Sequence, residues 1–317
     1  MMRALSLSLS LSLSLSLSLS LSLSLVACST SPAATDASSD ARELGDPVST
    51  SDAHDVGPPL DAWSPLDGHV EEPAPLPDAG AIALPPANGG LDYQLGGAYT
   101  PPTGVTIVSR DRMDPPASGL YDICYVNGFQ IQPGEDAMWM SAHPTAILRN
   151  AAGDPVIDTD WNETLIDTST AAKRAEVIAM IGPWIDQCAA DGFDAVEIDN
   201  LDSYSRSTGL LTEDDNVAMI RLFADRAHAA GLAIAQKNSS ELVGRRAEMG
   251  TDFVVAEECN RYMECDVYLG AYDRVLMIEY RRADFTAGCA AYPSSSIVLR
   301  DVNLVPMGSS GYVYDGC

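Results

Sequence analysis

From about residue 90 onward, the chain repeats a short apolar run that ends in polar residues. These runs predict eight strands, at 93–95, 105–109, 121–127, 193–199, 233–237, 253–257, 275–279 and 296–300. Amphipathic stretches predict helices at 170–190, 213–230 and 240–249, with shorter pieces from Glu264 and Asp284. Buried strands that alternate with helices indicate an α/β fold with a parallel sheet, and eight strands predict a (β/α)8 TIM barrel. The irregular region 130–167 is expected to be a long insertion over the barrel mouth.

The first 27 residues follow a different pattern, in which Leu and Ser alternate from Leu5 to Leu25 after Arg3. Such alternation also suits a strand with one wet face. A basic residue, an apolar stretch and small residues at the amino end are instead typical of a secretory signal peptide. The segment ends Leu-Val-Ala before Cys28, which resembles the lipobox of bacterial lipoproteins, so we expect residues 1–27 to be cleaved and Cys28 to be lipidated. An unlipidated signal peptide or an artefact of repeat expansion is the alternative.

Residues 28–89 are rich in Pro, Ala, Ser and Asp and show no sustained apolar periodicity. Such a stretch buries too little surface to offset its ordering entropy, so it is predicted to be a disordered tether. The globular domain then covers residues 90–317. The expected location is the cell envelope, on a membrane through the lipid at Cys28, or outside the cell if lipidation does not occur.

Composition excludes several classes of function. The chain carries 45 acidic and 18 basic residues, a net charge of −27, which would repel nucleic acid. Its four histidines do not have metal-ligand spacing, and we find no GxSxG elbow and no phosphate-binding glycine loop. We therefore expect no metal and no cofactor, and the sequence indicates no protein partner.

Nearly every predicted strand ends in a polar or ionisable residue, where TIM barrels place their active sites. The candidates are Gln94, Asp111, Asn127, Asp199, Lys237, Asn238, Glu257, Glu258, Glu279 and Asp301. Some of these could simply mark the start of polar loops. The runs VEIDN, VVAEE and VLMIEY, however, carry carboxylates off otherwise apolar strands, where burial perturbs the pKa of a carboxyl group.

Strand alternation constrains this set further. Asp199 shares a face with Glu197, and Glu257 shares a face with Val255, whereas Glu258 faces the other way. Lys237 is one of only two lysines in the domain and follows an apolar run, so it is expected where the carboxylates converge. A buried ion pair without a catalytic role is the alternative for this lysine.

Carboxylates from separate strands around a polar mouth suit glycoside cleavage, in which one protonates the departing oxygen while the other attacks or activates water. Their separation decides between retention and inversion. Several tyrosines could serve as sugar platforms, although each could equally belong to the core: Tyr93, Tyr99, Tyr125, Tyr204, Tyr262 and Tyr280.

Five separated segments resemble glycoside hydrolase family 114: DYQL (92–95), GFDAVEIDNLDSY (192–204), LAIAQKN (232–238), VVAEECNRYMEC (254–265) and MIEY (277–280). The resemblance covers essentially all of 90–317. It implies a TIM barrel, an endo-acting enzyme that cleaves α-1,4 linkages in galactosamine-containing polysaccharide, and Asp199 and Glu257 as the two catalytic carboxylates. The adjacent Glu258 is the alternative to Glu257. We expect the substrate to be bound by Gln94, Asp111, Asn127, Asn200, Asp202, Tyr204, Lys237, Asn238, Glu258, Glu279 and Tyr280.

Six cysteines follow Cys28, and an even number in an exported domain favours disulfides. Cys259–Cys265 would close a small loop directly after Glu257. Cys289–Cys317 would tie down the last residue, and Cys124–Cys188 follows by elimination. Free buried thiols are the alternative for that last pair. A zinc site is less expected because the sequence has no CxxC pair.

Two functions from different classes fit these observations. The first is a surface-tethered endo-glycosidase that acts on a cationic amino-sugar polymer, since residues 90–317 have a net charge of −18 and would attract protonated amines. The second is a lipid-anchored carbohydrate-binding protein that keeps the barrel without the chemistry. The joint presence of Asp199, Glu257, Glu279 and Lys237 favours the enzyme.

Overall fold

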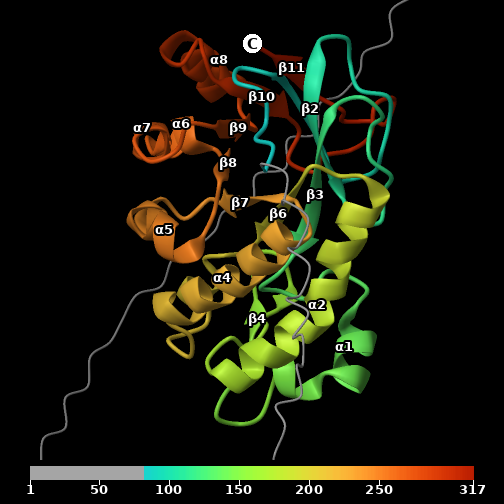
Figure 1. Ribbon diagram of the computed structural model, residues 1–317. Coiled ribbons are helices and arrows are strands. Elements are labelled where there is room, and N and C mark those ends of the chain that lie inside the picture. Colours follow the sequence, from blue (N-terminus) through green and yellow to red (C-terminus); the bar gives the residue numbers. More distant parts are fainter. Residues whose placement is uncertain (1–81) are drawn as a thin grey trace, which may run out of the picture. The chain divides into compact units, whose positions relative to one another are not determined.

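The computed structural model describes residues 82–317, which fold around one curved sheet (Figure 1). Eight strands run parallel and follow one another in chain order around the sheet. They are β1 (Gly90–Gln94), β2 (Val105–Asp111), β3 (Tyr121–Asn127), β6 (Ala195–Asp199), β7 (Ala233–Lys237), β8 (Phe253–Glu257), β9 (Val275–Glu279) and β10 (Ser296–Arg300). The eight predicted strands are confirmed. The predicted signal peptide, Cys28 and nearly all of the predicted tether lie outside the described residues.

The barrel is nearly closed rather than continuous. A ninth strand, β11 (Tyr314–Gly316), which the sequence did not predict, pairs antiparallel with β10 at the edge that would otherwise meet β1. Side chains connect β1 and β10 at this gap, which we call the seam. Arg300 on β10 forms a fully buried ion pair with Asp92 on β1, at 3.2 Å. Gln94 and Arg110 extend this polar seam, since Gln94 donates to Asp92 and accepts from Arg110.

Helices cover the outside of the later strands (Figure 1). They are α2 (Ala171–Asp191), α4 (Glu213–Ala229), α5 (Arg246–Met249) with a 3-10 turn before it (Ser240–Arg245), α6 (Cys259–Tyr262), α7 (Cys265–Leu269) and α8 (Arg282–Ala291), with a single turn, α3 (Ser203–Arg206), after β6. The three long predicted helices are present, although the one predicted at 240–249 is divided into a 3-10 turn and α5. Loops without a helix follow β1 and β2, so the covering layer is incomplete on that side.

Local sequence explains where the two long helices begin. Thr170 caps α2 by accepting from the backbone N–H of Lys173, and Gly192 ends the helix in the left-handed conformation. Thr212 and Asp215 form a capping box at the start of α4, where three acidic residues also favour the helix dipole. Both helices bury their apolar faces against the outer face of the sheet.

The insertion predicted at 130–167 lies between β3 and α2. It contains α1 (Asp136–Ala142), a 3-10 turn (Pro144–Ala146) and a hairpin of β4 (Ile157–Asp158) with β5 (Glu163–Thr164). Trp139 and neighbouring apolar residues pack into the main core. Asp158 anchors the hairpin, because it is buried and contacts Arg206 Nε at 2.7 Å and Gln130 Nε2 at 2.8 Å.

Strand alternation divides the core into two layers. One apolar cluster takes residues from all eight parallel strands and fills the barrel interior, among them Ala195, Ala235, Val255 and Ile278. The alternate strand residues pack outward against the helices. This alternation sends Asp199, Lys237 and Glu257 toward the inside, and it sends Glu279 outward with Met277.

Three disulfides join the domain's cysteines in the predicted pairs, Cys124–Cys188, Cys259–Cys265 and Cys289–Cys317. The shortest loop follows Glu257 directly and the longest joins β3 to α2. Within residues 82–317, no helix is both long enough and apolar enough to cross a membrane.

Candidate active site

A cavity of about 870 Å³ opens at the carboxyl ends of the parallel strands. Seven carboxylates and three cations line it: Glu163, Asp199, Asp202, Glu241, Glu257, Glu258 and Glu264 with Arg206, Lys237 and Arg261. This is the edge at which barrels of this class place their active sites. The excess of carboxylates makes the cavity a strongly negative environment.

Lys237 lies at the base of this cavity and is almost fully buried. Its Nζ lies 2.9 Å from Glu197, 3.1 Å from Asp199 and 3.2 Å from Glu257. Burial alone would lower the pKa of Lys237, but the surrounding negative charges, with Asp199 and Glu257 foremost, raise it well above its ordinary value. The lysine therefore remains charged and holds three carboxylates together.

Each of these carboxylates also accepts a hydrogen bond from a tyrosine. Tyr93 donates to Glu197 at 2.5 Å and Tyr125 donates to Asp199 at 2.6 Å, while Tyr280 donates to Glu257. Burial raises the pKa of all three phenols. They therefore stay protonated donors, and they are fixed by hydrogen bonds rather than free as sugar platforms.

Asp199 ends β6 and is held in its ionised form. Burial would raise its pKa, but Lys237, Tyr125 and the backbone N–H of Asn200, which donates at 2.8 Å, together lower the pKa below its ordinary value. Asn200 takes up a left-handed backbone conformation (φ 66°), which asparagine tolerates better than most residues. An ionised carboxylate at the base of a cavity can act as a nucleophile or a base.

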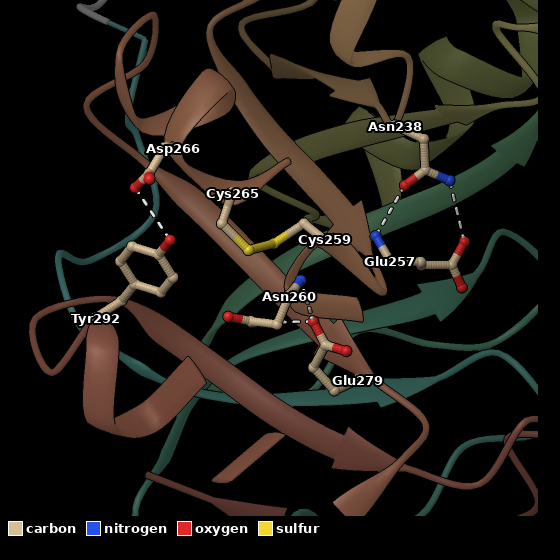
Figure 2. The surroundings of a disulfide bond; sticks show 8 residues. All are labelled: Asn238, Glu257, Cys259, Asn260, Cys265, Asp266, Glu279 and Tyr292. Atoms are coloured by element: carbon tan, nitrogen blue, oxygen red, sulfur yellow. Dashed lines mark hydrogen bonds between the residues drawn. A yellow bond between two sulfur atoms is a disulfide. The ribbon is translucent and has the colours of Figure 1, made fainter. Parts of the chain in front are cut away.

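Asn238 positions Glu257, as Figure 2 shows. Its Oδ1 accepts from the backbone N–H of Glu257 at 2.8 Å, and its Nδ2 donates to Glu257 Oε2 at 3.3 Å. The next residue, Glu258, has a left-handed backbone (φ 55°) and pairs with Arg261 at 2.6 Å. Glu257 therefore points at Lys237, while Glu258 is engaged at the wall of the cavity.

The structure places Glu279 outside the cavity, contrary to expectation. Its Oε1 accepts from both the backbone N–H and the side-chain amide of Asn260, each at 2.9 Å, beside the Cys259–Cys265 disulfide (Figure 2). Burial raises its pKa. The sulfurs and a Glu279 oxygen lie within 4.8 Å of one another, but the two sulfurs are bonded together and are not free thiolates. Glu279 follows the outward face of β9, and Tyr280 takes the inward position.

The other predicted binding residues divide into two groups. Those that line the cavity are Asn200, Asp202, Lys237, Asn238, Glu258 and Tyr280. The others lie outside it. Gln94 belongs to the seam, and Asp111 accepts from Gln132 at 2.6 Å. Asn127 donates to the wall residue Glu163, and Tyr204 donates to the wall residue Glu241.

Sequence reasoning missed several residues that line the cavity, namely Trp161, Glu163, Arg206, Glu241, Arg261 and Glu264. Trp161 and Glu163 come from the insertion, which has no periodic pattern.

Comparison with known proteins agrees with the fold. A family model described as glycoside hydrolase family GH114 matches residues 72–317. The chain is similar to Ega3 of Aspergillus fumigatus, solved in complex with galactosamine, with 22% identity and a TM-score of 0.59, over 75% of this chain and 100% of that one.

It also matches the glycoside hydrolase domain of PelA from Pseudomonas aeruginosa, with 15% identity and a TM-score of 0.48, over 70% of this chain and 98% of that one. No curated protein matches the chain. Since the family model spans most of the sequence, the chain belongs to glycoside hydrolase family 114 and is a glycoside hydrolase.

Proposed function

We propose that the protein is an exported endo-glycosidase that hydrolyses α-1,4 linkages in a cationic, galactosamine-containing polysaccharide, with Asp199 and Glu257 as its catalytic carboxylates. The observation that carries this proposal is their convergence on one buried cation, Lys237, at the base of an open cavity. The family and the likeness to Ega3, which was solved with galactosamine, support the substrate class.

The two carboxylates suit different roles. Asp199 has a lowered pKa and three hydrogen-bond or ionic partners, so it attacks the anomeric carbon. Glu257 then protonates the departing oxygen and later removes a proton from the water that releases the sugar. Each oxygen lies within 3.2 Å of Lys237 Nζ, so the two are at most about 6.4 Å apart. This upper bound lies just below the roughly 6.5–9.5 Å of inverting enzymes and admits the roughly 5–5.5 Å of retaining ones, so it favours retention.

Product analysis tests this function directly. A partly deacetylated galactosamine polymer incubated with the protein should yield short oligosaccharides with new reducing ends. The Asp199→Asn variant should yield none above background. Binding of the polymer without any product would contradict the proposal and favour the non-catalytic carbohydrate-binding protein.

Charge should determine which polymers bind. Seven carboxylates against three cations around the cavity favour protonated amines and disfavour acidic polymers such as pectin or alginate. Affinity for a deacetylated polymer should fall as the Debye length shrinks from ~10 Å at 0.1 M salt to ~3 Å at 1 M. Full N-acetylation should weaken binding in the same direction. Salt-independent affinity would leave the net charge as a solubility feature.

The anchoring part of the proposal rests on the sequence before the domain. We propose that Cys28, directly after Leu-Val-Ala, carries a lipid that holds the enzyme at a membrane of the cell envelope. The Cys28→Ala substitution should remove the lipid, so that the enzyme leaves the membrane or is mislocalised. Wild-type protein that takes up no labelled fatty acid would contradict this part and leave a secreted enzyme.

A further inference from the structure

The β4–β5 hairpin (157–164) forms one wall of the cavity and carries a tryptophan at its turn. Trp161 lines the cavity, and 64% of the residue is exposed. Aromatic side chains that line a cavity commonly contact the ligand that binds there. Sugars are ligands of this kind, because the apolar face of a pyranose ring packs flat against an aromatic side chain. Because Asp158 ties the hairpin to Arg206 and Gln130, the platform is held in place.

Glu163, on the same hairpin, differs from most other carboxylates of the cavity. Its Oε2 accepts from Asn127 Nδ2 at 2.9 Å, and within residues 82–317 no cation lies in ion-pair distance of it. By contrast, Asp202 pairs with Arg206 and Glu258 pairs with Arg261. Glu163 is half-buried in the wall, so it offers a partly desolvated carboxylate that has no ion-pair partner among the described residues.

The partner of Glu163 places it on the Asp199 side of the cavity. Asn127 ends β3 opposite Asp199 in the register of β3 and β6. Asn127 Oδ1 also accepts from Asn200 Nδ2 at 3.0 Å. One chain of hydrogen bonds therefore connects Glu163 to the residue that follows Asp199, and a sugar attacked by Asp199 would lie within reach of the hairpin.

We propose that the β4–β5 hairpin recognises an amino sugar, with Trp161 against the face of the pyranose ring and Glu163 accepting from its ammonium group. The inference rests on the proposed function and assigns the selectivity for deacetylated sugar to one structural element. An acetamido group is neutral and bulkier, so it neither pairs with Glu163 nor neutralises it. Charge-assisted hydrogen bonds are the stronger kind, which makes this contact the main source of discrimination.

Proton binding supports the same contact. Burial raises the pKa of Glu163 to about 7, with further upward contributions from Asp199 and Asp158, while Asn127 and Arg206 oppose the rise. A substrate ammonium would favour the ionised carboxylate and lower this pKa. The contact needs an ionised Glu163 and a protonated amine, so affinity for a galactosamine oligosaccharide should increase as pH rises toward about 7 and fall again once the amine loses its proton.

The experiment uses the full chain with Glu257→Gln, which blocks turnover and leaves Asp199 in place. Binding of a galactosamine tetrasaccharide and of its fully N-acetylated counterpart is measured by calorimetry between pH 5.5 and 8.5. Adding Glu163→Gln should weaken binding of the first by at least ~10-fold near pH 7, remove its increase between pH 5.5 and 7 and leave the second unchanged. Trp161→Ala should weaken both. Asp160→Asn is the matched control, since Asp160 lies in the same turn, is exposed and does not line the cavity. It should stay within about twofold.

Four results would overturn the inference. Unchanged affinity and pH dependence in the Glu163→Gln protein would remove ammonium recognition from the hairpin while the proposed function stands. Equal weakening of both tetrasaccharides by Glu163→Gln would make Glu163 a general support of the wall. In the chain that retains Glu257, a fall in kcat at unchanged KM would make Glu163 a proton donor instead. A parent chain that binds neither tetrasaccharide would overturn the proposed function as well.

Discussion

Two buried cations end strands of the same barrel, Lys237 on β7 and Arg300 on β10. Lys237 contacts three carboxylates, those of Glu197, Asp199 and Glu257, and the cavity opens above it. Arg300 is equally buried, but its contacts are Asp92, Asp301 and two backbone carbonyls, and it does not line the cavity. The Lys237 cluster carries surplus negative charge beside the cavity, whereas the Arg300 cluster has no access to the cavity.

The two clusters differ in whether they substitute for missing main-chain hydrogen bonds between strands. At the seam, Arg300 and Asp92 join β1 and β10, the two strands that the sheet order leaves without mutual main-chain pairing. Around Lys237 the strands are already paired, so the charges are not needed to join them. A cluster of buried charges that borders a cavity and is not needed to join strands is therefore the better indicator of a catalytic site.

Arg300→Met should have the largest effect, and it should fall on stability. The substitution leaves Asp92 buried and unpaired, which costs about 3–5 kcal/mol of unfolding free energy. Denaturant unfolding measures this loss, and the doubly substituted Arg300→Met, Asp92→Asn protein should recover part of it. A loss below about 1 kcal/mol would show that the seam does not depend on the ion pair.

Asp199→Asn and Glu257→Gln should act on turnover and leave the fold intact. Each should lower kcat by at least ~100-fold, the lower range for a positioned acid or base. Unfolding curves serve as the control, because both side chains are replaced by neutral groups of the same size. Activity that survives Glu257→Gln but is lost in Glu258→Gln would move the assignment by one residue. Activity that survives in all three variants would remove this cluster from the chemistry.

Sequence reasoning found what depends on local pattern. Apolar runs marked all eight parallel strands, and alternation along β8 put Glu257 on the face of Val255, which lies inside the barrel. The same rule applied to β9 would have put Ile278 inside and Glu279 outside, so it would have kept Tyr280 in the predicted site and removed Glu279. Glu279 was included because it ends an apolar strand, which does not fix the direction of its side chain.

The rest of the site depends on contacts between distant segments. Gln94 ends β1 in the same way that Asp199 ends β6, but the seam that takes it up forms only when β1 and β10 meet. Trp161 and Glu163 lie in an insertion without periodicity, and only the folded hairpin brings them to the cavity. Neither fact can be derived from spacing along the chain.

Lys237→Met tests whether the cation sets the protonation of the site. Without it, Glu197, Asp199 and Glu257 would share one desolvated region, so the pKa of Asp199 should rise. The acidic limb of the kcat/KM profile should move upward by at least about one pH unit. The surplus carboxylates should also make the variant more stable as pH falls, since protonation removes their repulsion. An unmoved acidic limb would contradict this role.

Glu279→Gln should have the smallest effect on catalysis and gives the sharpest contrast with Glu257, since both residues end apolar strands. Turnover should stay within about threefold because the side chain lies outside the cavity. Burial raises the pKa of Glu279, so the folded state holds this proton more tightly than the unfolded state does. Its contribution to stability is therefore present below the ordinary pKa of a glutamate and is lost as pH rises through the folded value. The amide does not titrate, so the variant should lose less stability across that range in denaturant unfolding followed against pH. A large fall in kcat with an unchanged stability profile would return Glu279 to the site and show that an outward strand end also takes part in the reaction.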